Sequence, residues 1–172
     1  PDHRPVTPGS PEPGFIARGG NIPVGYWKDS AKTATTFPVI EGKRWSIPGD
    51  FCLLHDDSSI TLLGRGSVCI NTAGEKVYPE EVEEVLKQHA SVEDALVVGV
   101  PDDKWGNAVT AVVELSQGAV FDEAVLRTHV RDNLAGYKTP KRVLAVKQMF
   151  RASNGKPDYK LAVEFARNAL GV

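Results

Sequence analysis

Short apolar runs separated by turn residues predict a small, mostly β unit over residues 14–63. The predicted elements are strands at 15–17 and 21–24, a helix at 30–35 that Asp29 can cap, and hairpins at 39–46 and 51–63. Residues 1–13 contain five prolines, and proline suits neither a helix interior nor a central strand. We therefore expect residues 1–13 to form an irregular segment.

Beyond residue 64 the apolar runs become longer, and helical spacing alternates with β-branched stretches. The predicted elements are a helix from residue 79, strands at 95–100, 108–115 and 142–146, and helices at 122–134 and 159–169. The positions expected to face the core are Val82, Val85, Leu86 and His89 in the first helix and Val125, Leu126, His129 and Val130 in the second. This order over about 105 residues predicts a compact α+β domain with a three-stranded sheet and flanking helices.

Composition places the chain among ordinary globular proteins. Of its 172 residues, 41% are apolar and 24% charged, and the net charge of −2 gives no general reason to expect a nucleic-acid partner. The charge is uneven, however, because residues 138–160 hold seven basic side chains against the single acid Asp158. Such a local field attracts phosphates, although a solvated basic face is the alternative interpretation.

The two cysteines, Cys52 and Cys69, lie in apolar, strand-like runs, which fits buried thiols in a reducing compartment better than a disulfide. No metal site is predicted around Cys52 and His55, because no second Cys/His pair has ligand spacing. We expect no signal peptide, and no apolar run in the sequence approaches the roughly 18 residues of a membrane helix. We expect a cytoplasmic protein without a transmembrane segment, peripheral to membranes at most through its substrate.

The densest local signal is the stretch from Gly64 to Leu86. Gly64 and Gly66 flank Arg65, so the backbone can turn while a fixed cation stays available, as in a hinge beside an anion or hydroxyl site. Residues 73–76 predict a tight reversal, and Pro79 with the glutamates after it marks the start of a helix.

Five motifs between residues 14 and 160 occur in the order of one known superfamily. They are Gly25-Tyr26-Trp27-Lys28-Asp29, Trp45 to Asp50, Gly64 to Leu86, Leu134 to Lys141, and Asn154-Gly155-Lys156. They resemble the adenylate-forming enzymes, which comprise acyl-CoA synthetases, adenylation domains and luciferases, and within them the fatty-acid and steroid-side-chain CoA ligases of actinobacteria. The resemblance implies that residues 1–64 end a large N-terminal domain and that residues 65–172 form a mobile lid, with a hinge near Ser67.

The resemblance also implies a reaction and a role for each site residue. A carboxylic acid, here a fatty acid or a steroid side chain, reacts with ATP to give acyl-AMP, and CoA then accepts the acyl group. Mg²⁺ would accompany ATP without binding this part of the enzyme. By their positions in the motifs, Lys156 is the catalytic lysine, Asp50 and Arg65 hold the ATP ribose, and Gly74, Trp105, Tyr137, Lys138 and Lys141 contact CoA.

Some features depart from the superfamily pattern. Ser67 stands at the pivot, where Asp or Lys is usual, and Ser46-Ile47-Pro48 precedes Gly49-Asp50 where Thr is common. The glycine-rich phosphate loop and the acyl-binding segments have no match, so we expect a C-terminal piece of a longer enzyme, inactive without its N-terminal domain. Two alternatives stay open: an adenylation protein that loads a carrier protein, and a degenerate, non-catalytic lid that serves as a binding module.

Overall fold

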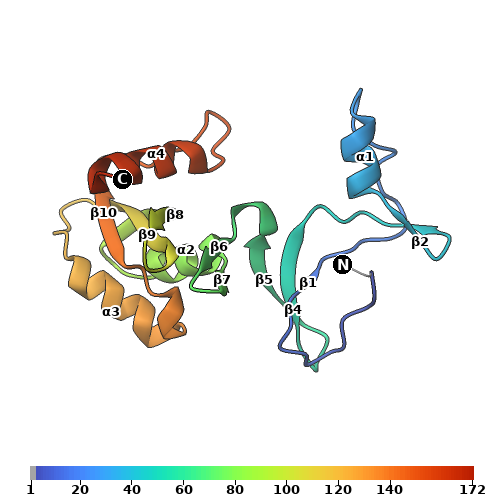
Figure 1. Cartoon of the computed structure of the whole chain (residues 1–172), viewed down its shortest axis with the longest axis horizontal. Helices are drawn as coiled ribbons and strands as arrows, with labels where there is room; N and C mark the ends of the chain where they lie inside the picture. The colour runs from blue at the N-terminus through green and yellow to red at the C-terminus, as the bar shows by residue number, and fades with distance from the viewer. Residues whose placement is uncertain (1–2) are drawn as a thin grey trace. The chain divides into compact units, whose positions relative to one another are not determined.

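The computed structural model of the chain describes residues 3–172, except for the side chain of Ser67 (Figure 1). The chain divides into two compact units, residues 1–67 and residues 68–172, and a short 3₁₀ turn, η1 (Gly66–Val68), spans the division. The division lies between residues 67 and 68, on the C-terminal side of the boundary predicted between residues 64 and 65. The hinge role of Ser67 stays a prediction, because its side chain lies outside the described residues.

The first unit is a small β structure with one short helix. Its elements are β1 (Gly14–Phe15), α1 (Ser30–Thr36), β2 (Val39–Ile40), β3 (Lys43–Arg44), β4 (Asp50–Leu54) and β5 (Ile60–Arg65). Strands β1, β4 and β5 form an antiparallel sheet, and β2 pairs with β3. The side chain of Asp29 accepts the backbone N–H of Lys32 at the start of α1. The two predicted hairpins and the capped helix are therefore confirmed.

The strand predicted at residues 21–24 is wrong. These residues are irregular, because Pro23 has no N–H to donate to a neighbouring strand. The carbonyl of Val24 accepts a 2.7 Å hydrogen bond from the guanidinium of Arg44 instead. A side chain thus satisfies the backbone where a strand partner was expected.

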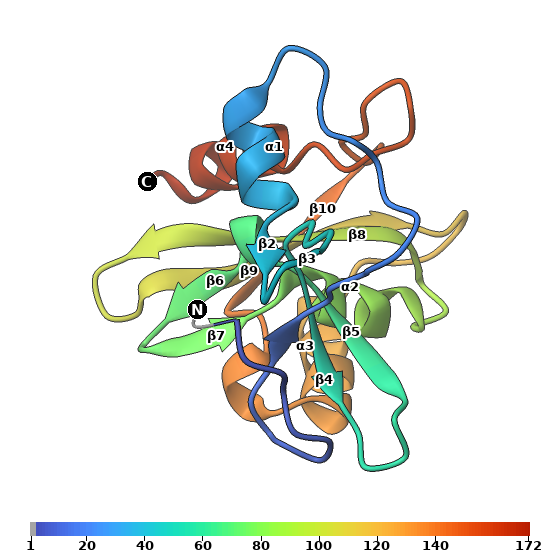
Figure 2. The ribbon, with the colours of Figure 1, turned by 90° about the vertical axis from the view of Figure 1, so that its right-hand side faces the viewer.

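The second unit holds a three-stranded sheet between helices. Its elements are β6 (Ile70–Thr72), β7 (Glu75–Val77), α2 (Pro79–Lys87), β8 (Val92–Asp102), β9 (Gly106–Leu115), α3 (Glu123–Asn133), the 3₁₀ turn η2 (Gly136–Lys138), β10 (Arg142–Val146) and α4 (Tyr159–Leu170). The sheet has the order β10-β9-β8, with β10 parallel and β8 antiparallel to β9. Helix α4 lies on one face of this sheet and α3 on the other in both views (Figures 1 and 2). The predicted α+β class and element order are confirmed.

Strand β8 shows how this sheet is buried on both faces. Ala95 and Val97 belong to a cluster with the buried residues of α2 and α3, whereas Leu96 and Val98 pack with α4. Successive side chains of a strand point to opposite faces, so a sheet covered by helices on both sides needs an unbroken apolar run. The sequence supplies that run, and the second unit therefore has a core of its own.

Helix α3 differs in one respect from its predicted orientation. Leu126 and Val130 are buried as expected, but Val125 is 46% exposed. Leu126 and Val130 lie one turn apart and define the buried stripe, and Val125 is rotated by about 100° from Leu126 around the helix.

None of the helices in the described part of the chain has the length and apolar character needed to span a bilayer.

Candidate active site

The first pair of predicted site residues lies at one end of the β4–β5 hairpin. Asp50 begins β4, Arg65 ends β5, and the two residues are directly opposite in the strand register. Arg65 Nε donates to Asp50 Oδ1 at 3.1 Å, and the N–H of Gly66 donates to the carbonyl of Gly49 at 3.3 Å. The structure thus brings the two predicted ribose contacts together. The Arg65 side chain is 67% exposed, so the ion pair stabilises the fold little. The Asp50 side chain is 29% exposed, and its carboxylate can accept further hydroxyl groups.

The turn between β6 and β7, which contains Gly74, is hydrogen-bonded to the backbone of Trp105 through Ala73. Ala73 and Gly74 both have positive φ, +50° and +88°, as the central residues of a tight two-residue hairpin turn require. No atom lies within 4 Å of the position that a Cβ on Gly74 would occupy, so the turn faces open space. The N–H of Ala73 donates to the carbonyl of Trp105 at 2.9 Å, which ties this turn to the β8–β9 loop.

Two lysines lie against the ring of Trp105. Lys141 Nζ is 4.3 Å from the ring centroid and Lys104 Nζ is 4.9 Å from it, both within the range of a cation–π interaction. The backbone N–H of Lys141 donates to the carbonyl of Val109, which fixes the segment before β10 against β9. Trp105, Lys104 and Lys141 therefore form one cluster with an aromatic face and two ammonium groups, and the hydrogen bond from Ala73 joins the turn of Gly74 to it. Lys104 is the member of this cluster that the sequence motifs did not identify.

Tyr137 and Lys138 are held differently. Lys138 Nζ donates to both carboxylate oxygens of Glu81 in α2, at 2.6 and 2.7 Å. The side chains of this pair are only 17% and 19% exposed, so the charge of Lys138 is largely neutralised within the fold. Tyr137 is 40% exposed, and Lys138 Nζ lies 5.8 Å from its ring centroid. In this arrangement the ammonium group of Lys138 is occupied by the ion pair that joins η2 to α2.

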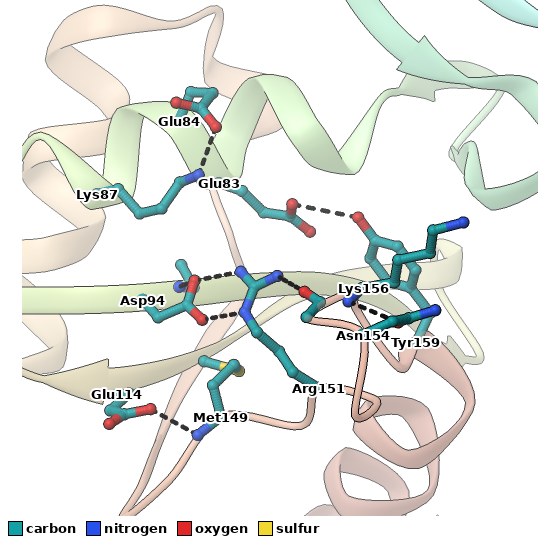
Figure 3. Close-up of polar contacts among 12 residues, drawn as sticks. Glu83, Glu84, Lys87, Asp94, Glu114, Met149, Arg151, Asn154, Lys156 and Tyr159 are labelled. Carbon is teal, nitrogen blue, oxygen red and sulfur yellow. Dashed lines mark hydrogen bonds and ion pairs between the residues drawn. The ribbon is translucent and has the colours of Figure 1, made fainter.

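Lys156 lies in a tight loop just before α4 (Figure 3). Its N–H donates to Asn154 Oδ1 at 3.1 Å, its carbonyl accepts the N–H of Ala152 at 2.9 Å, and Gly155 takes a left-handed φ of +78°. The side chain of Asp158 then caps α4 by accepting the N–H of Leu161. Lys156 is exposed, so its ammonium group can approach a bound anion.

Sequence reasoning counted Arg151 only as one charge of the basic stretch 138–160. In the structure Arg151 Nε and Nη2 donate to the two carboxylate oxygens of Asp94 at 2.6 and 2.7 Å (Figure 3). Burial works against the charge of Asp94, but the hydrogen bonds from Arg151 and from the N–H of Ala95 outweigh it and lower the pKa of that carboxyl. Arg142 is ion-paired as well, with Glu123, so part of the positive field expected here is neutralised.

Sequence reasoning also missed Glu83, a carboxylate in α2 that is 5% exposed. Its oxygens accept the N–H of Val97 at 2.8 Å and the hydroxyl of Tyr159 at 3.2 Å. Burial raises the pKa of Glu83 to about 7, and the two hydrogen bonds only partly oppose that rise. Glutamate is frequent on exposed helix faces, so no signal in the sequence distinguished this one.

Comparison with known proteins gives a family match for part of the chain. Residues 81–156 match the family model described as AMP-binding enzyme C-terminal domain. This range of the chain is similar to the C-terminal domain of AMP-binding enzymes. The match includes Trp105, Tyr137, Lys138 and Lys141, and it ends on Lys156. The resemblance inferred from the sequence motifs is confirmed.

Named CoA ligases and a solved CoA synthetase structure are similar to this chain. The chain is 53% identical over 161 residues to 3-oxocholest-4-en-26-oate–CoA ligase of Rhodococcus rhodochrous, covering 94% of the chain and 29% of the relative. It is 53% identical over 163 residues to a medium/long-chain-fatty-acid–CoA/3-oxocholest-4-en-26-oate–CoA ligase of Mycobacterium tuberculosis, covering 95% and 30%. The solved structure of o-succinylbenzoate CoA synthetase from Bacillus subtilis in complex with its acyl-adenylate intermediate matches with a TM-score of 0.81 at 28% identity, covering 91% of this chain and 31% of that chain. The chain thus spans less than a third of the length of these relatives.

Proposed function

We propose that this chain is the C-terminal part of an ATP-dependent acyl-CoA synthetase. In the first half-reaction a carboxylate attacks the α-phosphate of ATP and releases pyrophosphate, leaving acyl-AMP. In the second, the CoA thiol attacks the acyl carbon and AMP leaves. The observation that carries this proposal is the 53% identity, over nearly the whole chain, to ligases that are named for this chemistry.

The acid that we propose is a medium- or long-chain fatty acid or a steroid side-chain carboxylate. The two relatives at 53% identity are named for such acids. The choice between a fatty acid and a steroid belongs to the acyl-binding part of the relatives, which this chain does not match. Assay of both acid classes therefore belongs in the first experiment.

In the first half-reaction we assign Lys156 to the transferring phosphate. Its ammonium group, on an exposed loop, can stabilise the negative charge that develops on the α-phosphate oxygens. The carboxylate of Asp50 would accept two ribose hydroxyls, and the hydrogen bond from Arg65 orients that carboxylate. We assign Mg²⁺ to ATP rather than to this chain, as the resemblance to adenylate-forming enzymes implies.

In the second half-reaction we assign Gly74, Trp105 and Lys141 to CoA. The open turn at Gly74 leaves room for a narrow pantetheine arm, while Lys141 offers its charge to a phosphate. Tyr137 would contact the arm from its exposed side. Lys138 can reach CoA only by leaving Glu81, so we expect a smaller contribution from it.

Two rival functions remain to be tested. A carrier-protein loader would share the first half-reaction but not the use of free CoA, and a degenerate lid would bind without catalysis. The presence of Lys156, Asp50 and Arg65 at the motif positions argues against the degenerate lid. A thioester yield that saturates with free CoA in the full-length protein would identify the ligase.

The decisive variant is Lys156→Ala in the full-length protein. Removing one preorganised donor from a developing charge lowers a rate by roughly 10² to 10³, so acid-dependent pyrophosphate release should fall by that factor. Thioester formation from supplied acyl-AMP should be nearly unchanged, because the α-phosphate is not attacked in that step. Equal losses in both half-reactions would assign Lys156 a structural role, and absence of pyrophosphate release by the wild-type protein would refute the proposed function.

A further inference from the structure

One arginine connects the loop of Lys156 to the sheet. Arg151 donates from Nε and Nη2 to Asp94 in β8, and from Nη1 to the carbonyl of Gly155 at 3.0 Å. Gly155 directly precedes Lys156. The guanidinium therefore joins a rigid strand to the peptide group from which the lysine side chain starts (Figure 3).

The Arg151–Asp94 pair differs from an ordinary surface ion pair. Asp94 is only 16% exposed at its side chain, and its Oδ1 also accepts the N–H of Ala95 at 2.9 Å, which fixes the carboxylate on the strand. The contact is bidentate, and such fork-to-carboxylate pairs are both stronger and more directional than single contacts. A lysine at position 151 could not make the same three hydrogen bonds, because its ammonium group is a point charge.

Two further contacts hold the ends of the same segment. The N–H of Met149 donates to Glu114 Oε2 at 2.6 Å, and the hydroxyl of Tyr159 donates to Glu83. Between these anchors the loop contains Gly155 in a left-handed conformation and an exposed Lys156. Within the loop, the hydrogen bond from Arg151 is thus the side-chain link between the backbone at Gly155 and the sheet.

We propose that Arg151 and Asp94 are positioning residues for Lys156. They hold the peptide group of Gly155 so that the lysine ammonium group reaches the reacting phosphate in one orientation. The inference rests on the proposed function for the identity of the reacting group. All the residues concerned belong to the second unit, so the pair accompanies Lys156 in any movement of that unit. Its loss should therefore affect only the half-reaction in which Lys156 acts.

The test uses the full-length protein with Arg151→Ala, Arg151→Lys and Asp94→Ala. Misplacement of a catalytic group by about 1 Å can cost about 100-fold in rate, so each variant should slow pyrophosphate release by about 10- to 100-fold. Thioester formation from supplied acyl-AMP, and the KM for CoA, should stay at their wild-type values. Arg142→Ala is the matched control, since Arg142 is another ion-paired arginine of the second unit that lies outside this loop.

Combination with Lys156→Ala separates positioning from general stability. If Arg151 acts through Lys156, then Arg151→Ala should cause no further loss in the Lys156→Ala background. An additional loss there, equal losses in both half-reactions, or wild-type adenylation by both Arg151 variants would overturn the proposal.

A second measurement does not depend on catalysis. Amide hydrogen exchange of residues 152–156 should be faster in the Arg151 and Asp94 variants than in wild type and in Arg142→Ala. Unchanged exchange in this loop would also overturn the proposal. If the proposed function is wrong, the wild-type protein will release no pyrophosphate. The hydrogen-exchange result would still show whether Arg151 and Asp94 hold the loop of Lys156.

Discussion

At the scale of single residues, Glu83 joins three elements through one carboxylate. It extends from α2, accepts a backbone N–H of β8, and receives the hydroxyl of Tyr159 at the start of α4. Burial is the largest cause of its raised pKa of about 7, with a smaller contribution from repulsion by Glu80 and an opposing one from Lys87. The Glu83 carboxyl therefore titrates close to neutral pH, and it also binds Tyr159 at the start of α4, just after the loop of Lys156.

This raised pKa predicts a specific pH dependence of stability. The pKa of Glu83 is about 7 in the folded protein against an ordinary 4.5, so the folded state binds the extra proton between these values. The contribution of this proton to the free energy of unfolding is complete below pH 4.5 and is lost as the pH rises to about 7. The loss amounts to about 3 kcal/mol, because each unit of difference in pKa corresponds to about 1.36 kcal/mol. Glu83→Gln keeps the shape but cannot titrate: its amide oxygen can accept the N–H of Val97, and its amide NH₂ can donate to the hydroxyl oxygen of Tyr159. Its unfolding free energy relative to wild type should therefore increase over this range.

Urea unfolding between pH 4.5 and 8 measures this difference. Glu84→Gln is the control, because Glu84 is the next residue in α2, is 68% exposed at its side chain and pairs with Lys87. Parallel pH profiles for wild type and Glu83→Gln would show that the burial of Glu83 does not govern its proton.

The sequence identified Lys156, Asp50 and Arg65 as candidates because each lies at a position of the motifs that resemble the adenylate-forming enzymes. Their roles in catalysis and binding stay predictions. Asp94 and Glu83 could not be found in this way. Asp94 acquires its meaning from Arg151, 57 residues later, and Glu83 from Tyr159, 76 residues later. Such pairings depend on how the sheet and helices pack, and no local pattern contains that information.

At the scale of elements, local signals were sufficient where they were strong. Asp29, Asp122 and Asp158 each precede a helix, and each accepts a backbone N–H of its first turn. Strands β8 and β9 are longer than their apolar runs indicated, because their antiparallel pairing continues from Val100 through Pro101 to the Asp102–Gly106 pair. A strand end is thus set by the pairing partner as well as by hydrophobicity.

The turn η1 leads to a prediction about the hinge. Ser67→Pro in the full-length protein would fix φ and remove a backbone donor at the division between the two units. If Ser67 is the pivot, the switch between half-reactions should slow, and thioester formation should suffer more than pyrophosphate release. Single-turnover assays of each half-reaction measure this, with Ser67→Ala as the control that leaves the backbone free. Wild-type rates in both assays for Ser67→Pro would remove Ser67 from the hinge.

At the scale of the whole molecule, the buried apolar residues are unevenly distributed. Among the described residues of the first unit they are Phe37, Cys52 and Leu63, whereas the second unit has a cluster on each face of its sheet. Large apolar side chains such as Val24 and Trp27 remain 92% and 88% exposed in the first unit. Burial of apolar surface is the main source of folding free energy, so the second unit carries most of the stability of the chain.

The last prediction concerns the 172-residue chain by itself. We expect it to unfold cooperatively, since residues 68–172 hold a core closed on both faces, but to form no acyl-AMP. The contacts to ATP that we propose for Lys156, Asp50 and Arg65 are few, and the sequence contains no match to the glycine-rich loop that binds its phosphates. The measurement is thermal unfolding by circular dichroism beside pyrophosphate release with ATP and a fatty acid, with the full-length protein as the active control. Pyrophosphate release by the isolated chain would show that it holds a complete adenylation site. A non-cooperative melt would contradict the independent core.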